Sequence, residues 1–472
     1  MSLLLSHGYF LEEDPKEKLI MRPYPPLGIL YISAYLKQHG YAVQLLDSTF
    51  STKEEWKKKV LVQRPKAIAF YVNLMTKLNV LDLTRWVKTQ AALSDVKIIF
   101  GGPDVTHNSK DYLLAGADFI AVGEGEQTML EWMHQFHAPH PDWHAVNGLR
   151  FLDATGKEVI NAPREKLKDI DAFPWPDREG IDLTQYIKTW KQFHGQSTLS
   201  VSTQRGCPYT CKWCSTAVYG QSYRRRSPAL VVEELKALQQ RYQPDSFWFV
   251  DDVFTISHKW LSEFNDALKA AQLTISFECI TRADRLSEEV IGILKEAGCF
   301  RVWIGAESGS QEIINAMDRR VDVMKVREMI KMARKYGIQA GTFIMLGYPG
   351  ETRRNIEETI DHLKDSLPDH FTITVAYPIK GTGLFKQIES VQIHLPDWKK
   401  STDRDRDFVR VYPKAYYKFA VAKVVNEVNF HRDKVNGNSW SPTAIKRFLR
   451  YKTSGYIMNI FEVLNPTKKA VA

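Results

Sequence analysis

Short apolar runs alternate with amphipathic helical stretches through the first 135 or so residues, and this alternation limits the fold more than any other feature. The pattern is typical of a parallel sheet flanked by helices. Two predicted helices, residues 28–38 and 80–92, lie between predicted strands. The predicted strands are residues 3–5, 42–46, 67–72, 97–100 and 119–122. Residues 1–135 are therefore expected to form a doubly wound, Rossmann-like α/β domain.

Glycine and polar residues follow several of these strands, at the edge where a doubly wound sheet binds its ligands. Asp47 follows the second predicted strand, and Asn73 and Thr76 follow the third. Gly101-Gly102 ends the fourth strand, and Gly123-Glu124-Gly125 follows the fifth. Plain turn chemistry is the alternative explanation for the glycines.

A second alternation of strands and helices begins near residue 196, after a connector expected over residues 136–195. Its predicted strands are residues 199–203, 246–250, 275–280, 301–305, 339–346 and 370–376. Six such units predict a full or partial (β/α)6 barrel over residues 196–385. The aromatic and basic residues 386–472 are expected to form a helical C-terminal domain that caps the substrate site.

The composition is that of a folded globular protein rather than a disordered chain, with 44% hydrophobic and 12% aromatic residues among 472. A net charge of +9 favours anionic partners, but the basic residues near the C-terminus are mixed with acidic ones, which argues against nucleic acid. No stretch reaches the roughly 18 consecutive apolar residues that span a bilayer. A soluble, cytoplasmic protein is expected, with peripheral membrane contact by residues 456–461 as a hypothesis for a lipid or pigment substrate.

Three of the five cysteines lie within eight residues, at Cys207, Cys211 and Cys214. Three thiolates on one loop can hold three irons of a [4Fe–4S] cubane and leave the fourth iron open. A structural zinc site would need a fourth ligand, which no nearby Cys or His supplies at the usual spacing. Cys279 and Cys299 have no partner spacing and are expected to pack in the core.

The segment Arg205-Gly206-Cys207-Pro208, the three-cysteine loop and Trp213 closely resemble the radical S-adenosylmethionine superfamily. The resemblance implies that the open iron binds S-adenosylmethionine and that reduction yields a 5'-deoxyadenosyl radical. Residues 247–254, 302–309 and 343–352 resemble, in the same order, later cofactor-binding strand ends of that superfamily. The S-adenosylmethionine-binding residues expected from it are Trp213, Asp251, Asp252, Arg282, Glu307 and Ser308.

Each of these matches also has a purely structural interpretation. Asp251-Asp252 could cap a helix, Glu307 could belong to a structural salt bridge, and Arg282 could pair with Asp284.

The front domain resembles the cobalamin-binding class of this superfamily, in the group that contains the anaerobic magnesium-protoporphyrin ester cyclase and several carbon methylases. The resemblance rests on residues 22–28, on Gly101-Gly102-Pro103 and on residues 122–126. The cobalamin-binding residues expected from it are Leu27, Gly28, Asp47, Asn73, Thr76, Gly101, Gly102, Gly123, Glu124 and Gly125. Asp47-Ser48-Thr49 departs from the Asp-x-His loop that ligates cobalt, which fits either a radical enzyme without a lower protein ligand or a domain that has lost the cofactor.

The resulting hypothesis is a cobalamin-dependent radical enzyme that methylates an unactivated carbon of an anionic, partly apolar small molecule. A cyclase or rearrangement enzyme without methyl transfer is the first alternative, and a cobalamin-binding module without catalysis is the second. The resemblance also implies an electron donor such as flavodoxin or ferredoxin.

Overall fold

The computed structural model describes residues 3–215, 220–394 and 397–464 of the chain. The chain forms two compact units. Unit 1 comprises Met1–Pro208, Ser215–Phe247 and Pro396–Arg404, and unit 2 comprises Tyr209–Cys214, Trp248–Leu395 and Asp405–Ala472.

Unit 1 is built on a seven-stranded sheet with the order β2-β1-β3-β4-β5-β6-β7. Its first five strands are β1 (Leu3–Ser6), β2 (Val43–Leu46), β3 (Ala67–Tyr71), β4 (Lys97–Gly101) and β5 (Phe119–Ala121). These five pair in parallel, as predicted. The sheet continues into the predicted connector, where β6 (Leu149–Leu152) and β7 (Glu158–Ile160) add antiparallel strands.

Helices cover both faces of this sheet, because successive side chains of each strand point to opposite faces. Leu4, Ile68 and Phe70 belong to one apolar core, and Leu3 and Leu5 belong to the other. The helices of this part are α1 (Pro15–Ile20), α2 (Leu27–Gln38), α3 (Lys53–Gln63), α4 (Lys77–Thr89), α5 (Val105–Leu114), α6 (Gly125–His137) and α7 (Leu183–His194). Because helices cover both faces of the sheet, each strand is buried on both sides. This explains why the predicted strands are nearly continuous apolar runs.

A second sheet contains six strands in the order β15-β14-β13-β12-β11-β8. The strands are β8 (Thr198–Val201), β11 (Ser246–Phe249), β12 (Phe277–Thr281), β13 (Cys299–Glu307), β14 (Gln339–Leu346) and β15 (His370–Val375). All six lie where the sequence predicts them, and β12 to β15 pair in parallel with their neighbours. The order follows the chain, which is the topology of a partial barrel.

The helices that accompany this sheet begin with α8 (Pro228–Tyr242) in unit 1 and α9 (His258–Ala270) in unit 2. The others are α10 (Glu288–Glu296), α11 (Gln311–Ala316), α12 (Val323–Lys335) and α13 (Arg353–Ser366). Two short ribbons complete the strands: β9 (Gln204–Arg205) with β10 (Arg224–Arg225), and β16 (Gln392–His394) with β17 (Asp407–Phe408).

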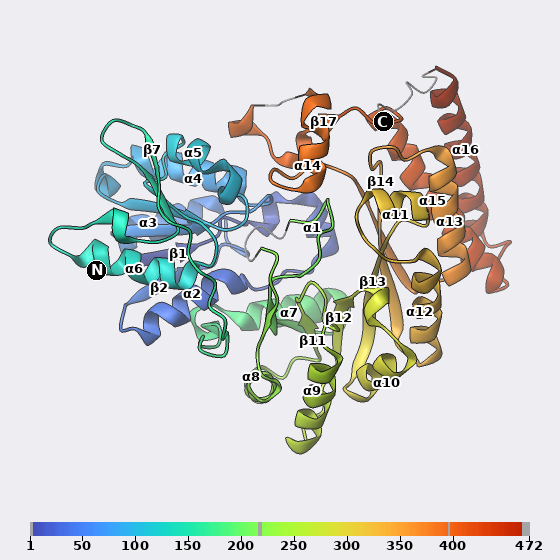
Figure 1. Ribbon diagram of the computed structural model, residues 1–472, viewed down its shortest axis with the longest axis horizontal. Helices are drawn as coiled ribbons and strands as arrows, with labels where there is room; N and C mark the ends of the chain where they lie inside the picture. The colour runs from blue at the N-terminus through green and yellow to red at the C-terminus, as the bar shows by residue number, and fades with distance from the viewer. Residues whose placement is uncertain (1–2, 216–219, 395–396, 465–472) are drawn as a thin grey trace. The chain divides into compact units, whose positions relative to one another are not determined.

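The C-terminal part of unit 2 is helical, as predicted. It contains α14 (Gly383–Ile388), α15 (Lys414–Val435) and α16 (Pro442–Leu464). The two long helices α15 and α16 pack side by side, and α15 also packs on α13 (Figure 1). In the described part of the chain, no helix is both long and apolar enough to cross a membrane.

A buried carboxyl closes the turn between β14 and α13. The backbone N–H of Gly347 donates to Glu351 Oε2 at 2.5 Å, and Oε1 has no partner among the described residues. Burial raises the pKa of Glu351 to about 8, and the hydrogen bond from Gly347 offsets only part of this rise. The native state therefore holds this proton more tightly than the unfolded chain does.

We expect the free energy of unfolding to fall as the pH rises from about 4.5 to 8, because the unfolded chain releases this proton first. The Glu351→Gln variant should lose much of this dependence, since each pKa unit corresponds to about 1.4 kcal/mol. Thermal unfolding of the protein under anaerobic conditions at pH 5.5 and 8 measures this pH dependence. Glu389→Gln, at an exposed position, is the control, and an unchanged slope in Glu351→Gln would contradict the assignment.

Candidate functional site

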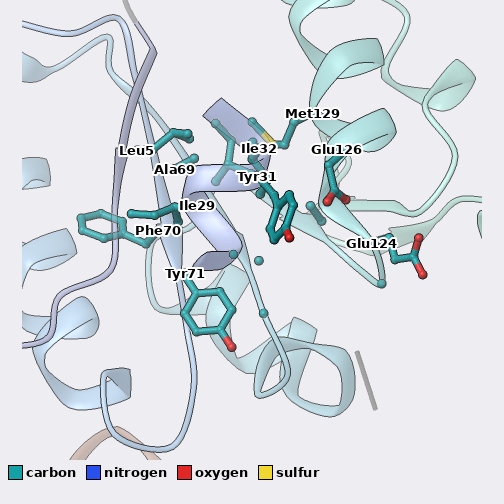
Figure 2. A pocket seen from close by; sticks show the side chains of 17 residues that line it. Leu5, Ile29, Tyr31, Ile32, Ala69, Phe70, Tyr71, Glu124, Glu126 and Met129 are labelled. Atoms are coloured by element: carbon teal, nitrogen blue, oxygen red, sulfur yellow. The ribbon is translucent and has the colours of Figure 1, made fainter. Parts of the chain in front are cut away.

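A pocket opens at the carboxyl ends of the parallel strands in unit 1. The ends of β1, β3, β4 and β5 and the first two turns of α2 and α6 line it. Figure 2 shows strand residues such as Leu5 and Phe70 on one side and the carboxylates of Glu124 and Glu126 on the other. This is the edge at which the sequence predicts ligand binding.

Six of the ten residues expected to bind cobalamin line this pocket: Gly28, Gly101, Gly102, Gly123, Glu124 and Gly125. The glycines leave room that other residues would occupy. At Gly28 and Gly101 an added Cβ would make only ordinary contacts with the protein, so a side chain there would take space from the pocket. Gly102 has a different role, because its φ of +109° and the Val72 carbonyl, 2.4 Å from an added Cβ, both require glycine.

The other four expected residues, Leu27, Asp47, Asn73 and Thr76, do not line the pocket. Asp47 Oδ1 lies 2.8 Å from His7 Nε2, and Asp47 Oδ2 accepts a hydrogen bond from the Tyr186 hydroxyl at 2.7 Å. Burial would raise the pKa of Asp47, but the hydrogen bonds and charge of His7 together with Tyr186 bring it down to about 2. Asn73 instead accepts from the backbone of its own turn, at Met75 and Thr76. Their roles in cobalamin binding stay predictions.

The apolar and aromatic part of the lining was not predicted from the sequence. Tyr31 and Ile32 come from the second turn of α2, Tyr71 from the end of β3 and Met129 from α6. The helical spacing of Gly28, Tyr31 and Ile32 is the signal that could have found two of them, since residues three and four apart share a helix face.

Buried ion pairs join the rim of this pocket to the segment that precedes the first cysteine of the motif. Arg205 Nη2 lies 2.5 Å from Glu126 Oε1, and Arg205 Nη1 lies 3.5 Å from Glu124 Oε2. Arg224, which faces Arg205 across the β9–β10 ribbon, also pairs with Glu124. The Arg205 guanidinium further lies over the rings of Phe173 and Tyr31. Because these groups are desolvated, removing one partner would leave a buried charge uncompensated.

Cys207 follows directly after this ribbon and is buried. Its backbone forms an isolated bridge with Gln221, and the intervening Gly206 has a φ of +81°. An added Cβ at Gly206 would lie 2.4 Å from the Ser222 carbonyl oxygen. Glycine is therefore required before this cysteine for a steric reason.

Cys211 and Cys214 lie on a loop that unit 2 holds by its backbone. The N–H of Lys212 donates to the Met317 carbonyl at 3.0 Å, and the Lys212 carbonyl accepts from Leu384 at 2.7 Å. The N–H of Cys214 donates to the Cys211 carbonyl at 3.1 Å. These bonds fix the loop between the end of α11 and the start of α14.

Two buried arginines surround the thiol of Cys211. Arg282 Nη1 and Arg319 Nη1 lie 3.7 and 3.6 Å from its sulfur. Arg282 also forms two hydrogen bonds with Asp284, as its structural interpretation predicts, and stacks 3.8 Å above the ring of Tyr209. Guanidinium donors stabilise a thiolate, which is the form that binds metal.

Glu307, at the carboxyl end of β13, completes this group. Its Oε1 lies 3.8 Å from Arg319 Nη2, and Arg319 also donates to the Gly305 carbonyl at 3.0 Å. Burial raises the pKa of Glu307, while Arg319 and Arg282 act in the opposite direction. Its φ of +65° is strained for a residue other than glycine, and such strain is concentrated at functional sites. Glu307 and Arg282 were predicted from the sequence, but Arg319, which lies outside every motif, was not.

The remaining predicted S-adenosylmethionine residues differ in their surroundings. Trp213 packs on an apolar cluster of unit 2, with Arg319 over its ring at 5.5 Å. Asp251 is buried and Asp252 is exposed, yet the surrounding protein and the charge of Asp251 raise the pKa of Asp252. Ser308 is buried and lies within hydrogen-bond distance of the Thr359 hydroxyl. Contact with S-adenosylmethionine stays a prediction for all of them.

The donor set fits the expected cofactors. Among the described residues, no three Cys, His, Asp or Glu side chains converge on one metal ion. A cubane does not require such convergence, because its cysteines bind different irons. The arginines at Cys211 suit a thiolate ligand, and the pocket in unit 1 keeps the space that side chains at Gly28 and Gly101 would otherwise occupy.

Two known protein families match this chain, each over a different part of it. The Radical SAM superfamily matches residues 201–363, and the B12 binding domain matches residues 21–132. The chain therefore belongs to the cobalamin-binding class of radical S-adenosylmethionine enzymes. Its cofactors are a [4Fe–4S] cluster, S-adenosylmethionine and cobalamin. The radical domain makes it an enzyme rather than a cobalamin-binding module without catalysis.

Individual relatives agree with this class. An uncharacterized methyltransferase of Pyrococcus horikoshii is 28% identical over 391 residues, which cover 81% of this chain and 82% of the relative. The anaerobic magnesium-protoporphyrin IX monomethyl ester cyclase of Rubrivivax gelatinosus is 23% identical over 93% of this chain and 81% of its own length. The solved structure of the cobalamin-dependent S-adenosylmethionine radical enzyme OxsB shares the fold, with a TM-score of 0.76 and 16% identity over 98% of this chain and 75% of that one.

We expect Gly101→Val to lower cobalamin affinity at least tenfold, because the new side chain enters the pocket while its Cβ clashes with no protein atom. Cobalamin titration followed by absorbance measures the affinity. Ala92→Val places a valine at an exposed position of unit 1 and should bind like the unaltered chain. Equal affinities for both variants would show that cobalamin does not occupy this pocket.

Arg319→Met should reduce the iron retained after anaerobic reconstitution by at least half. The change removes a donor to Cys211 and leaves Glu307 buried with one partner fewer. Breaking a buried ion pair lowers the free energy of unfolding by about 3 kcal/mol. Iron analysis and the electron paramagnetic resonance spectrum measure the effect. The neighbouring Arg320 is exposed, so Arg320→Met is the control, and equal iron in both variants would contradict this role.

Proposed function

We propose that this enzyme methylates an unactivated carbon of an anionic, partly apolar small molecule. The proposal rests first on the ion pairs of Arg205, Arg224, Glu124 and Glu126, which bind the rim of the candidate cobalamin pocket to the segment that carries Cys207. A connection of this kind favours a reaction in which cobalamin and radical chemistry act together.

When bound, the cluster and S-adenosylmethionine supply a hydrogen-abstracting radical, and cobalamin supplies the methyl group. The protein's own groups place these cofactors and exclude water. Cys207, Cys211 and Cys214 would hold three irons, with Arg282 and Arg319 stabilising the Cys211 thiolate. Asp252, Arg282 and Glu307 are proposed to position the nucleoside.

The candidate cobalamin pocket offers no histidine among the described residues that could ligate cobalt from below, and His7 is held elsewhere. Its Nε2 is engaged with Asp47, and no histidine lines the pocket. This arrangement supports a cobalt that binds no protein histidine, as the departure at Asp47-Ser48-Thr49 suggested.

Two observations support an anionic substrate and methyl transfer. The net charge of +9 favours an anion, and a relative named as a methyltransferase matches 81% of the chain. A cytoplasmic flavodoxin or ferredoxin is the proposed electron donor.

Oxidative cyclisation without methyl transfer is the second candidate. It is favoured by the likeness to the magnesium-protoporphyrin ester cyclase, which extends over 93% of this chain. The two candidates differ in what becomes of S-adenosylmethionine.

Methylation predicts that S-adenosylhomocysteine and 5'-deoxyadenosine accumulate together when the holoenzyme turns over with methyl-labelled S-adenosylmethionine and a reductant. Magnesium protoporphyrin IX monomethyl ester and a panel of amphipathic carboxylates and phosphonates are the substrates to test. Liquid chromatography with mass detection measures both nucleosides and the label in product. Product with 5'-deoxyadenosine but no S-adenosylhomocysteine would establish cyclisation instead.

The Cys211→Ala variant should form no 5'-deoxyadenosine, because one iron of the cluster loses its ligand. Cys299→Ser is the control, since its hydroxyl can keep the hydrogen bond from Cys299 Sγ to the Arg301 carbonyl. Turnover that persists in Cys211→Ala would remove the radical mechanism.

A further inference from the structure

The outer face of α16 in unit 2 carries an exposed apolar stripe. Ile445, Leu449, Tyr456, Ile460 and Val463 each expose between 41% and 78% of their surface. Their intervals of four, seven, four and three residues keep them on one side of a helix with 3.6 residues per turn. The stripe is roughly 27 Å long at 1.5 Å per residue. A solvated helix normally presents polar residues on this face.

The opposite face of α16 accounts for how the helix is held. Ala444, Ser454 and Met458 are buried, and Arg353 Nη1 contacts Glu462 at 3.3 Å. The helix packs on α15 through this side. Unit 2 therefore leaves much of the stripe uncovered, and the exposure of these apolar residues needs another explanation.

Basic residues flank the stripe. Lys446 and Arg450 are exposed and form no ion pair within the described residues. Lys452 is also exposed and lies over the rings of Phe448 and Tyr451. The helix carries four basic residues and one acidic residue, and Lys468 and Lys469 follow it in the sequence. Cations beside an exposed apolar face complement an anionic surface.

Exposed aromatic residues, which are typical of proteins at a membrane interface, also lie on or near the stripe. Trp440, just before α16, is 88% exposed, and Tyr456 lies in the middle of the stripe. Rings that combine an apolar body with a polar tip prefer the boundary between water and lipid. No helix in the described part of the chain is suited to crossing the membrane, so contact would be with its surface.

We propose that the outer face of α16 docks on a membrane surface that contains anionic phospholipid. The apolar stripe would enter the boundary between headgroups and acyl chains, and Lys446, Arg450 and Lys452 would contact the lipid phosphates. The inference does not depend on which reaction the enzyme catalyses.

A second copy of this chain fits the same face less well. A parallel pair of stripes would bring the flanking lysines and arginines of both copies together, and an antiparallel pair would still join two helices that each carry four basic residues and one acidic residue. Like charges in contact oppose association, whereas anionic headgroups would neutralise them.

Cosedimentation of the full-length holoprotein with vesicles tests the proposal. Vesicles of phosphatidylcholine with 30% phosphatidylglycerol should bind the protein at least tenfold more strongly than vesicles of phosphatidylcholine alone, and added salt should weaken binding. Leu449→Glu should lower the partition coefficient at least tenfold. Met324→Glu, at an exposed apolar residue of α12, is the matched control and should bind like the unaltered chain.

Cobalamin and iron contents of Leu449→Glu should equal those of the control, which shows that the variant is folded. Failure of the unaltered protein to sediment with anionic vesicles would overturn the proposal, and so would equal partitioning of Leu449→Glu and Met324→Glu. A dimer in solution that Leu449→Glu dissociates, without vesicle binding by the unaltered chain, would assign the stripe to a second copy instead.

Discussion

Strands that run in parallel have their carboxyl ends at the same edge of the sheet, and the candidate cobalamin site follows from this constraint. The strands β1, β3, β4 and β5 bring Leu5, Phe70, Gly101 and Ala121 to one edge of the sheet in unit 1, although these residues lie far apart in the sequence. Side chains would crowd that edge, and glycines there leave the pocket open. The position of the pocket is thus a result of sheet topology, and its size is a result of residue choice.

Buried arginines are the second recurring feature of the molecule. Arg205 in unit 1 faces two carboxylates at the pocket rim, and Arg319 in unit 2 faces Glu307 and the sulfur of Cys211. Taking such charges out of water is costly, so these groups contribute little to net stability compared with apolar packing. Their planar donor groups instead fix direction, which is what the placement of a cluster loop requires.

Most of the architecture could be predicted from the sequence because it depends on local periodicity. The five strands of the front domain and the six strands of the second sheet lie where apolar runs occur, with ends that differ by a few residues. The extension of the first sheet by β6 and β7 was missed, since short antiparallel strands in a polar connector have weak patterns. Among the site residues, the glycines were found because backbone turns have a sequence signature. Tyr31 and Arg319 were not, because an aromatic residue in a helix or an arginine in a turn has none.

The sequence by itself determined the cofactor chemistry, because three cysteines on one loop and glycines after successive strands act through spacing that is local in the chain. Tertiary structure alone decided which charges meet. Arg205 reaches Glu126 across 79 positions and Arg319 reaches Cys211 across 108, and no pattern along the chain encodes such distances. It also decided that Asp47 is engaged by His7 and Tyr186 rather than facing the pocket. The physical reason is that burial and long-range pairing depend on how the elements pack, whereas strand, turn and cluster motifs depend on neighbours in the sequence.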